Sequence, residues 1–236
     1  MRTEMESGPK PMMTIGHRPV LWHIMRYYAH FGHTDFILCL GYGSATVKDY
    51  FLRYDETRSN DFVLSKGGRG IELLQSDISE WRISFIETGI DTPIGERLRR
   101  VRHLIEDDEV FLANYGDVLT DAPMNQIIDD FIASDAVGSL LAVPPTASFH
   151  VVGVDQRSRV DGINSVSTLP IWMNGGYFVL RQGIFRCPRT QRRSGRGRVP
   201  TPGRDRTAGG RPVHGVLGPD GHLEGAQPPG GAASNR

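Results

Sequence analysis

Residues 19–41, PVLWHIMRYYAHFGHTDFILCLG, combine a helix pattern with a strand pattern that follows it directly. Apolar side chains recur at helical spacing over residues 19–32, and Gly32 interrupts the pattern. Residues 35–40 then form a short, mostly apolar run that ends at Gly41. Such a run is typical of a strand buried in a parallel sheet. This stretch therefore predicts an α/β domain.

The alternation of helix and strand patterns continues as far as residue 185. We expect helices at 46–54, 94–105 and 122–134, and strands at 81–86, 110–114 and 138–143. Short connections between such elements favour a Rossmann-like, mostly parallel sheet with helices on both faces. Ligands of these sheets bind beyond the carboxyl ends of the strands. The glycine-rich stretch at residues 67–70 lacks the context of a phosphate-binding loop and predicts a hairpin tip.

Composition changes sharply after Phe185. Residues 186–236 contain ten of the 27 Lys and Arg residues but three of the 27 Asp and Glu residues, so a net charge of zero hides a basic tail. Arg, Gly and Pro dominate this segment, and Ile, Phe, Tyr, Trp, Met and Lys do not occur in it. It cannot bury enough apolar surface to offset the entropy of ordering, which predicts a disordered tail. A basic tail could bind nucleic acid, but this one has no aromatic residues for base stacking, so we expect no nucleic-acid partner.

The cysteine content and the N-terminus predict a cytoplasmic protein. Cys39 and Cys187 are the two cysteines, and no CxxC pattern occurs, so neither a disulfide framework nor a cysteine zinc site is indicated. The first residues contain no apolar signal core, and no run approaches the length that spans a membrane. We therefore expect no membrane partner.

A lysine between two prolines precedes the first helix pattern. The rings of Pro9 and Pro11 limit the backbone freedom on either side of Lys10. A lysine ammonium is a compact charge that suits phosphate oxygens, so Lys10 is a candidate phosphate ligand. The alternative is an ordinary surface lysine, which is the usual fate of this residue type.

Tyr115-Gly116-Asp117 directly follows the strand expected at 110–114. A carboxylate at the carboxyl end of a parallel strand is well placed to hold Mg²⁺ over the phosphates of a ligand. Gly116 would let the backbone approach that ligand closely. A simple turn is the alternative, because Gly and Asp are common turn residues.

Two further stretches complete the set of candidate sites. The loop at residues 87–93 leads into the helix expected at 94–105, whose N-terminus offers free N–H groups to an anion. The arginines of this helix could instead form a solvated face. Asn174-Gly175-Gly176 predicts a tight turn that leads into an apolar strand.

Together these stretches resemble the glucose-1-phosphate cytidylyltransferases, within the larger sugar-phosphate nucleotidyltransferase family. The resemblance covers about residues 9–185 and is strongest at 9–25, 87–117 and 173–180. It implies the nucleotide-diphospho-sugar transferase fold. It also implies transfer of a cytidylyl group from CTP to α-D-glucose 1-phosphate, with Mg²⁺ as cofactor, in a homo-oligomer.

The resemblance also implies roles for individual residues. Lys10 and Arg97 would neutralise phosphates, and Asp117 would hold Mg²⁺. Thr92 would contact substrate as well. Asn174 and Gly175 would lie beside the glucose.

Several departures from the family pattern predict a partial domain at residues 9–185 with weak activity or none. Relatives carry a strand and a glycine-rich loop ahead of the Lys-Pro-Met segment, and this sequence contains neither. Ile94 stands at a position where a hydroxyl residue is usual, Glu96 replaces a glycine, and Val118 replaces another. Residues 165–170 lack the Glu and Lys that contact the sugar phosphate in relatives.

The basic tail has a second interpretation, a reading-frame error. Read one base later, suitable codons for residues 214–226 can spell a Gly-Phe-Trp-Ala-Pro-Met-Asp-Thr-Leu string, which resembles the family's C-terminal motif. The functional alternatives are another sugar-1-phosphate nucleotidyltransferase, a non-catalytic remnant, and a regulator that binds sugar nucleotides.

Overall fold

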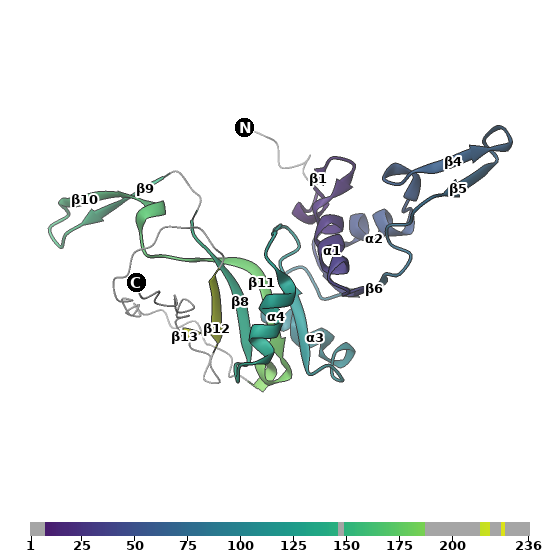
Figure 1. Ribbon diagram of the computed structural model, residues 1–236. Coiled ribbons are helices and arrows are strands. Elements are labelled where there is room, and N and C mark those ends of the chain that lie inside the picture. The colour runs from purple at the N-terminus through teal and green to yellow at the C-terminus, as the bar shows by residue number, and fades with distance from the viewer. Residues whose placement is uncertain (1–7, 146–148, 187–212, 218–222, 225–236) are drawn as a thin grey trace, which may run out of the picture. The chain divides into compact units, whose positions relative to one another are not determined.

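The computed structural model describes residues 8–145, 149–186, 213–217 and 223–224 (Figure 1). The chain divides into two compact units. The first comprises Met1–Asp107 and Tyr115–Met124, and the second comprises Asp108–Asn114 and Asn125–Arg236.

A pair of parallel strands forms the centre of the first unit. β3 (Asp35–Leu40) pairs with β6 (Arg82–Glu87) in a register that runs from Asp35 opposite Arg82 to Leu40 opposite Glu87. The bounds of β3 are those that the sequence predicts, and β6 is shifted by one residue. Both strands therefore end at the same edge, where the sequence predicts ligand binding.

Two helices contribute to the apolar core of this unit. α1 (Val20–His30) supplies Leu21 and Met25, and α2 (Ser44–Leu52) supplies Val47. They form a buried cluster with Leu40, against which further partly buried apolar side chains pack: Met12, Phe36, Leu38, Phe51, Trp81, Ile83 and Phe85. The members from β3 alternate along the strand, so they share one face of the pair, and both helices cover that face. α3 (Ile94–Val101) lies against β3 and continues into η4 (Arg102–Leu104).

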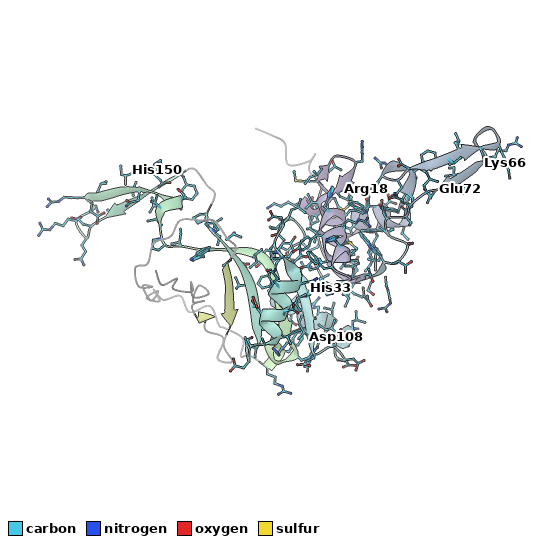
Figure 2. The ribbon with its side chains drawn as sticks, in the orientation of Figure 1. Arg18, His33, Lys66, Glu72, Asp108 and His150 are labelled. Carbon is cyan, nitrogen blue, oxygen red and sulfur yellow. The ribbon has the colours of Figure 1, made fainter. Side chains whose placement is uncertain are left out.

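A long hairpin is inserted between α2 and β6. β4 (Phe62–Ser65) and β5 (Gly70–Leu73) are antiparallel, and η3 (Lys66–Gly68) forms the tip, which confirms the predicted hairpin. The hairpin extends away from α1 and α2, and Lys66 and Glu72 mark it in Figure 2. At its base, the carboxylate of Glu56 in η2 (Glu56–Arg58) accepts hydrogen bonds from the amides of Asp77 (2.9 Å) and Ile78 (3.4 Å).

A buried arginine connects this base to the segment that precedes α1. Arg18 lies in β2 (Arg18–Pro19), which pairs with β1 (Thr14–Ile15), and it is 3% exposed (Figure 2). Its guanidinium donates to the hydroxyl of Ser59 (3.0 Å) and the carbonyl oxygen of Asp55 (2.9 Å), and lies 3.5 Å from the carboxylate of Asp77.

Tyr54 belongs to the same buried cluster. The Arg18 guanidinium stacks 4.1 Å from the centre of the Tyr54 ring, and the Tyr54 hydroxyl donates to Asp77 (3.0 Å). Burial, and secondarily this hydrogen bond to a carboxylate, raise the pKa of Tyr54. The phenol therefore stays protonated and continues to donate at neutral pH.

The second unit contains a five-stranded sheet in the order β13-β12-β8-β11-β7. β11 (Met173–Arg181) runs antiparallel to both of its neighbours, β7 (Val110–Asn114) and β8 (Gly138–Val143). β7 and β8 are therefore parallel to each other, as expected, and their bounds are the predicted ones. The pattern of apolar residues did not indicate that an antiparallel strand lies between them.

α4 (Met124–Ile132) packs into this unit through Ile127 and Phe131, which are 4% and 3% exposed. The end of the helix is held by Arg181, whose guanidinium donates to the carbonyl oxygens of Ile132 (3.2 Å) and Ala136 (3.2 Å). It also lies 4.7 Å from the centre of the Phe131 ring. Free carbonyl groups at a helix C-terminus favour a cation, so this contact satisfies them.

Three strand pairings complete the second unit. β9 (His150–Val154) and β10 (Val160–Ser165) form a hairpin followed by η5 (Val166–Thr168), and the sequence did not predict it. η6 (Gln182–Arg186) follows β11. Within the segment expected to be a disordered tail, β12 (Val213–Leu217) pairs antiparallel with β8 and with β13 (Leu223–Glu224). These two stretches differ from the expectation, and the tail from residue 187 onward lies otherwise outside the described residues. No helix in the described parts of the chain has the length and apolarity that crossing a membrane requires.

Candidate active site

Lys10 lies on a short 3-10 turn, η1 (Lys10–Met12), whose backbone is well held. The amide of Met12 donates to the carbonyl oxygen of Pro9 (2.7 Å), and the amide of Met13 donates to that of Lys10 (3.0 Å). Pro9 is buried, and Met12 packs against the core cluster of the first unit. The Lys10 side chain is 81% exposed. The turn is therefore fixed while its ammonium group stays in solvent.

Asp117 is the charged partner of Lys10. The Lys10 Nζ lies 3.9 Å from Oδ2 of Asp117, whose side chain is 34% exposed. Both residues belong to the first unit. An exposed ion pair at this distance contributes about 1 kcal/mol at most to stability. The structure thus brings together the predicted phosphate ligand and the predicted metal ligand, and both keep access to solvent.

Among the residues that the structure describes, Asp117 has no cluster of protein ligands with which to hold Mg²⁺. In the described part of the chain, no group of three or more His, Cys, Asp or Glu side chains could hold a metal ion. Mg²⁺ often keeps several waters and takes one or two carboxylates plus the phosphates of a substrate. A single, partly exposed carboxylate oxygen fits that mode of binding. The adjacent Lys10 ammonium would repel a bare cation, so a phosphate is needed to compensate the charge.

Arg97 on α3 is tied to backbone and side-chain oxygens at the ends of β3 and β6. Its Nη1 donates to the carbonyl oxygen of Leu40 (3.1 Å) and to Oγ1 of Thr88 (2.7 Å). Its Nε donates to the carbonyl oxygen of Thr92 (2.9 Å), and its Nη2 to that of Ile90 (2.9 Å). Most of the five N–H groups of this guanidinium therefore donate to oxygens of the protein itself.

The hydrogen bonds of Arg97 do not match those expected of a residue that neutralises a phosphate. A guanidinium that neutralises a phosphate presents its fork to the ligand, often through two parallel hydrogen bonds. The Arg97 fork is instead turned toward the loop at residues 88–92 and the end of β3. The contacts support a positioning role, in which Arg97 shapes the loop that carries Thr92. Phosphate neutralisation by Arg97 stays a prediction.

The sequence did not single out Thr88 or Gly41, which complete this arrangement. Thr88 is fully buried, and both its amide and its hydroxyl donate to the carbonyl oxygen of Leu40, each at 2.8 Å. A Cβ added at Gly41 would lie 2.8 Å from Nη1 and Nη2 of Arg97. Gly41 therefore leaves the space that the guanidinium occupies. In the sequence, the Gly41-Tyr42-Gly43 stretch directly after a strand is the feature that could have indicated this close approach.

Arg100, one turn further along α3, also donates to the carbonyl oxygen of Thr88 (2.5 Å). Thr92 is half-buried. Gly89 has φ +88°, and a Cβ added there would lie 2.9 Å from Oγ1 of Thr92, so the two residues are closely packed. The loop is thus compact and internally bonded. The structure places Thr92 at the N-terminus of α3, as predicted.

Asn174 and Gly175 belong to the second unit. They lie at the start of β11, where the register with β8 shifts between Asn174 and Phe178. The Asn174 Oδ1 accepts a hydrogen bond from the amide of Gly176 (2.8 Å), and a Cβ at Gly175 would lie 2.9 Å from the carbonyl oxygen of Leu141. The predicted turn is therefore an irregularity within a strand, and glycine is required there for close packing. The structure gives no position for these two residues relative to Lys10 and Asp117.

Solved structures with a similar fold are nucleotidyltransferases. The UTP-bound UGPase from Acinetobacter baumannii aligns with a TM-score of 0.52 at 18% identity, over 78% of this chain and 71% of that chain. A UDP-glucose pyrophosphorylase complexed with UDP-glucose aligns with a TM-score of 0.52 at 16% identity, over 79% and 73% of the two chains. At such identities the likeness shows the fold, which is the Rossmann-like, mixed α/β fold of nucleotide-sugar transferases.

Curated proteins identify the family within this class. The glucose-1-phosphate cytidylyltransferase of Salmonella typhimurium is 33% identical over 181 residues, which cover 75% of this chain and 68% of that protein. That of Salmonella typhi is 32% identical over the same shares. No protein-family model matches the sequence. The chain is a sugar-1-phosphate nucleotidyltransferase, and it belongs to the glucose-1-phosphate cytidylyltransferase family.

If Arg97 positions the loop, replacing it will destabilise the first unit. We expect Arg97→Lys to lower the free energy of unfolding by about 2–4 kcal/mol, because a lysine cannot make the forked hydrogen bonds to several oxygens. Thermal unfolding followed by circular dichroism measures this change. The matched control is Arg53→Lys at the exposed C-terminal end of α2, where we expect a loss below about 0.5 kcal/mol. Equal stability of the two variants would contradict the positioning role.

Proposed function

We propose that this chain transfers a cytidylyl group from CTP to α-D-glucose 1-phosphate and releases pyrophosphate. The observation that supports this substrate pair most strongly is the 33% identity, over 75% of the chain, to a protein named for this activity. The ion pair between Lys10 and Asp117 supports a site for phosphates, since it offers a cation and a hard oxygen ligand within 3.9 Å of each other.

In the proposed reaction a phosphate oxygen of glucose 1-phosphate attacks the α-phosphorus of CTP in line. A new P–O bond forms as the bond to the pyrophosphate leaving group breaks, so the product is CDP-glucose. The protein needs to position the two phosphates and to compensate their charge. Lys10 would contact phosphate oxygens, and the Gly116 backbone would lie beside the ligand.

Asp117 is the residue that would hold Mg²⁺ in this proposal. When bound, the ion supplies positive charge to phosphate oxygens in the transition state. Thr92 would contact substrate from the N-terminus of α3, where free amide groups favour an anion. Asn174 and Gly175 would face the glucose. Arg97 would act on the same site through the loop at residues 88–92.

Turnover of CTP and glucose 1-phosphate in the presence of Mg²⁺ tests the proposal. CDP-glucose is measured by chromatography and pyrophosphate by a coupled assay. We expect Lys10→Ala and Asp117→Asn to lower kcat/KM by about 100-fold, because Lys10 would compensate phosphate charge directly and Asp117 would hold the Mg²⁺ that does so. The control Lys66→Ala removes an exposed lysine at the hairpin tip and should keep wild-type activity.

Other outcomes of this assay distinguish the alternatives. Faster turnover with UTP, GTP or dTTP, or with another sugar phosphate, would replace the proposed substrate pair by another. Binding of CDP-glucose in calorimetry without any turnover would indicate a regulator that binds sugar nucleotides. Wild-type activity of both variants would contradict the proposed site.

We further propose that activity is weak because Glu96, in the first turn of α3, lowers the affinity for the phosphate-bearing substrate. A carboxylate there repels the anion that the helix N-terminus would otherwise favour. We expect Glu96→Gln to lower the KM for glucose 1-phosphate or CTP by about three- to tenfold, which steady-state kinetics would show. Glu72→Gln, on the β4–β5 hairpin, is the control. An unchanged KM in the Glu96 variant would show that this carboxylate does not act on the substrate.

A homo-oligomer is part of the proposal. On the β4–β5 hairpin, Leu64 and Ile71 are cross-strand partners and remain 59% and 58% exposed. Isolated hairpins are marginally stable in water, and exposed apolar patches mark interaction surfaces. We expect Leu64→Lys with Ile71→Lys to reduce the molar mass in light scattering to that of a monomer. Glu72→Lys, which changes charge on the same hairpin, should leave the mass unchanged. A monomeric wild-type protein would contradict the proposal.

A further inference from the structure

The position of Lys10 is set by its backbone, since contacts of its side chain are too weak to fix it. The side chain is 81% exposed, and its ion pair with Asp117 spans 3.9 Å. An exposed pair of this kind is worth little against the rotamer entropy of a lysine. Any precise placement of the ammonium group beside the carboxylate must come from how the residues on either side of Lys10 are held.

On one side, the Pro9 ring packs against Gly43. Gly43 precedes α2 and has φ +70°, a conformation that favours glycine. A Cβ added there would lie 2.5, 2.8 and 2.9 Å from Cγ, Cδ and Cβ of Pro9. These distances are far below van der Waals contact, and the obstruction is a rigid ring. A side chain at position 43 would therefore push Pro9 out of its buried site.

On the other side, the Pro11 ring packs against Gly116. A Cβ added at Gly116 would lie 3.2 Å from Cγ and 3.6 Å from Cβ of Pro11. This contact is less tight than that at Gly43, but Gly116 directly precedes Asp117. The Pro11 ring therefore touches the backbone from which the carboxylate partner of Lys10 extends.

We propose that Gly43 and Gly116 are positioning residues that seat the rings of Pro9 and Pro11 and thereby set the distance between Lys10 and Asp117. This inference rests on the proposed function for the roles of those two charged groups. Because proline fixes its own φ and restricts the residue before it, seating the two rings leaves the Lys10 backbone little freedom. Displacements of about 1 Å in a site that positions reacting groups can reduce rates about 100-fold.

The test compares two glycines of similar backbone conformation. Gly43→Ala introduces both a strained φ and the clash with Pro9. Gly67→Ala introduces a similar strain at φ +63°, but no atom lies within 4 Å of the added Cβ. We expect Gly43→Ala to lower kcat/KM about tenfold or more and Gly67→Ala to leave it unchanged. Replacing Pro9 by Ala in the Gly43→Ala variant removes Cγ and Cδ, the two closest of the three clashing ring atoms, and should restore part of the activity.

A double-mutant cycle with Lys10→Ala separates positioning of Lys10 from general damage. If Gly43 acts by placing Lys10, Gly43→Ala will cost much less in the Lys10→Ala background than in the wild type. Equal losses in both backgrounds, or wild-type kcat/KM for Gly43→Ala, would overturn the inference. The same cycle applies to Gly116→Ala, for which we expect a smaller effect because its contact is longer.

Hydrogen exchange gives a readout that does not depend on activity. Seating of the Pro9 ring predicts faster exchange of the Met12 and Met13 amides in Gly43→Ala than in Gly67→Ala, since both amides donate within this turn. Unchanged exchange would overturn the inference even if the enzyme is active. If exchange changes but Lys10→Ala has wild-type turnover, the proposed function of Lys10 fails while the seating of the ring is supported.

Discussion

One guanidinium group holds together the carboxyl edge of the parallel strand pair in the first unit. Backbone carbonyl groups at the end of a strand need partners when the chain above them is packed. Arg97 supplies several of them at once, by donating to Leu40 on β3 and to the loop that follows β6. Thr88, fully buried, adds two hydrogen bonds to Leu40. The position of α3, and with it Thr92, depends on this group of contacts.

The two basic residues predicted at the site are held in opposite ways. Arg97 is fixed through its side chain, whose planar fork matches several carbonyl oxygens. Lys10 has a flexible side chain that ends in solvent, so only its backbone is fixed, through proline rings that pack on Gly43 and Gly116. The arginine therefore organises the loop, whereas the lysine remains accessible to a ligand. The two basic residues thus differ in function, and the hydrogen bonds that their side chains make within the protein distinguish them.

Sequence patterns predicted the strands at 35–40, 110–114 and 138–143 with their observed bounds, because each is an apolar run that polar or glycine residues delimit. The direction of β11 was not predictable, since parallel and antiparallel strands share the same period. The β9–β10 hairpin was missed because its apolar residues are mostly exposed and give no core-facing pattern. The role of Arg97 depends on Leu40, 57 residues away in the sequence, and no local signal reports such a contact.

The segment that carries Lys10 is anchored at both ends, and the second anchor lies at the base of the β4–β5 hairpin. Arg18 ends this segment and is nearly fully buried between Ser59 and Asp77. A guanidinium that stays buried without its carboxylate costs several kcal/mol, so the contact between Arg18 and Asp77 favours keeping β2 at the hairpin base. The apolar core cannot impose this constraint, because burial is not directional. The hydrogen bonds of Arg18 to Ser59 and Asp55 therefore add a directional constraint between β2 and the hairpin base.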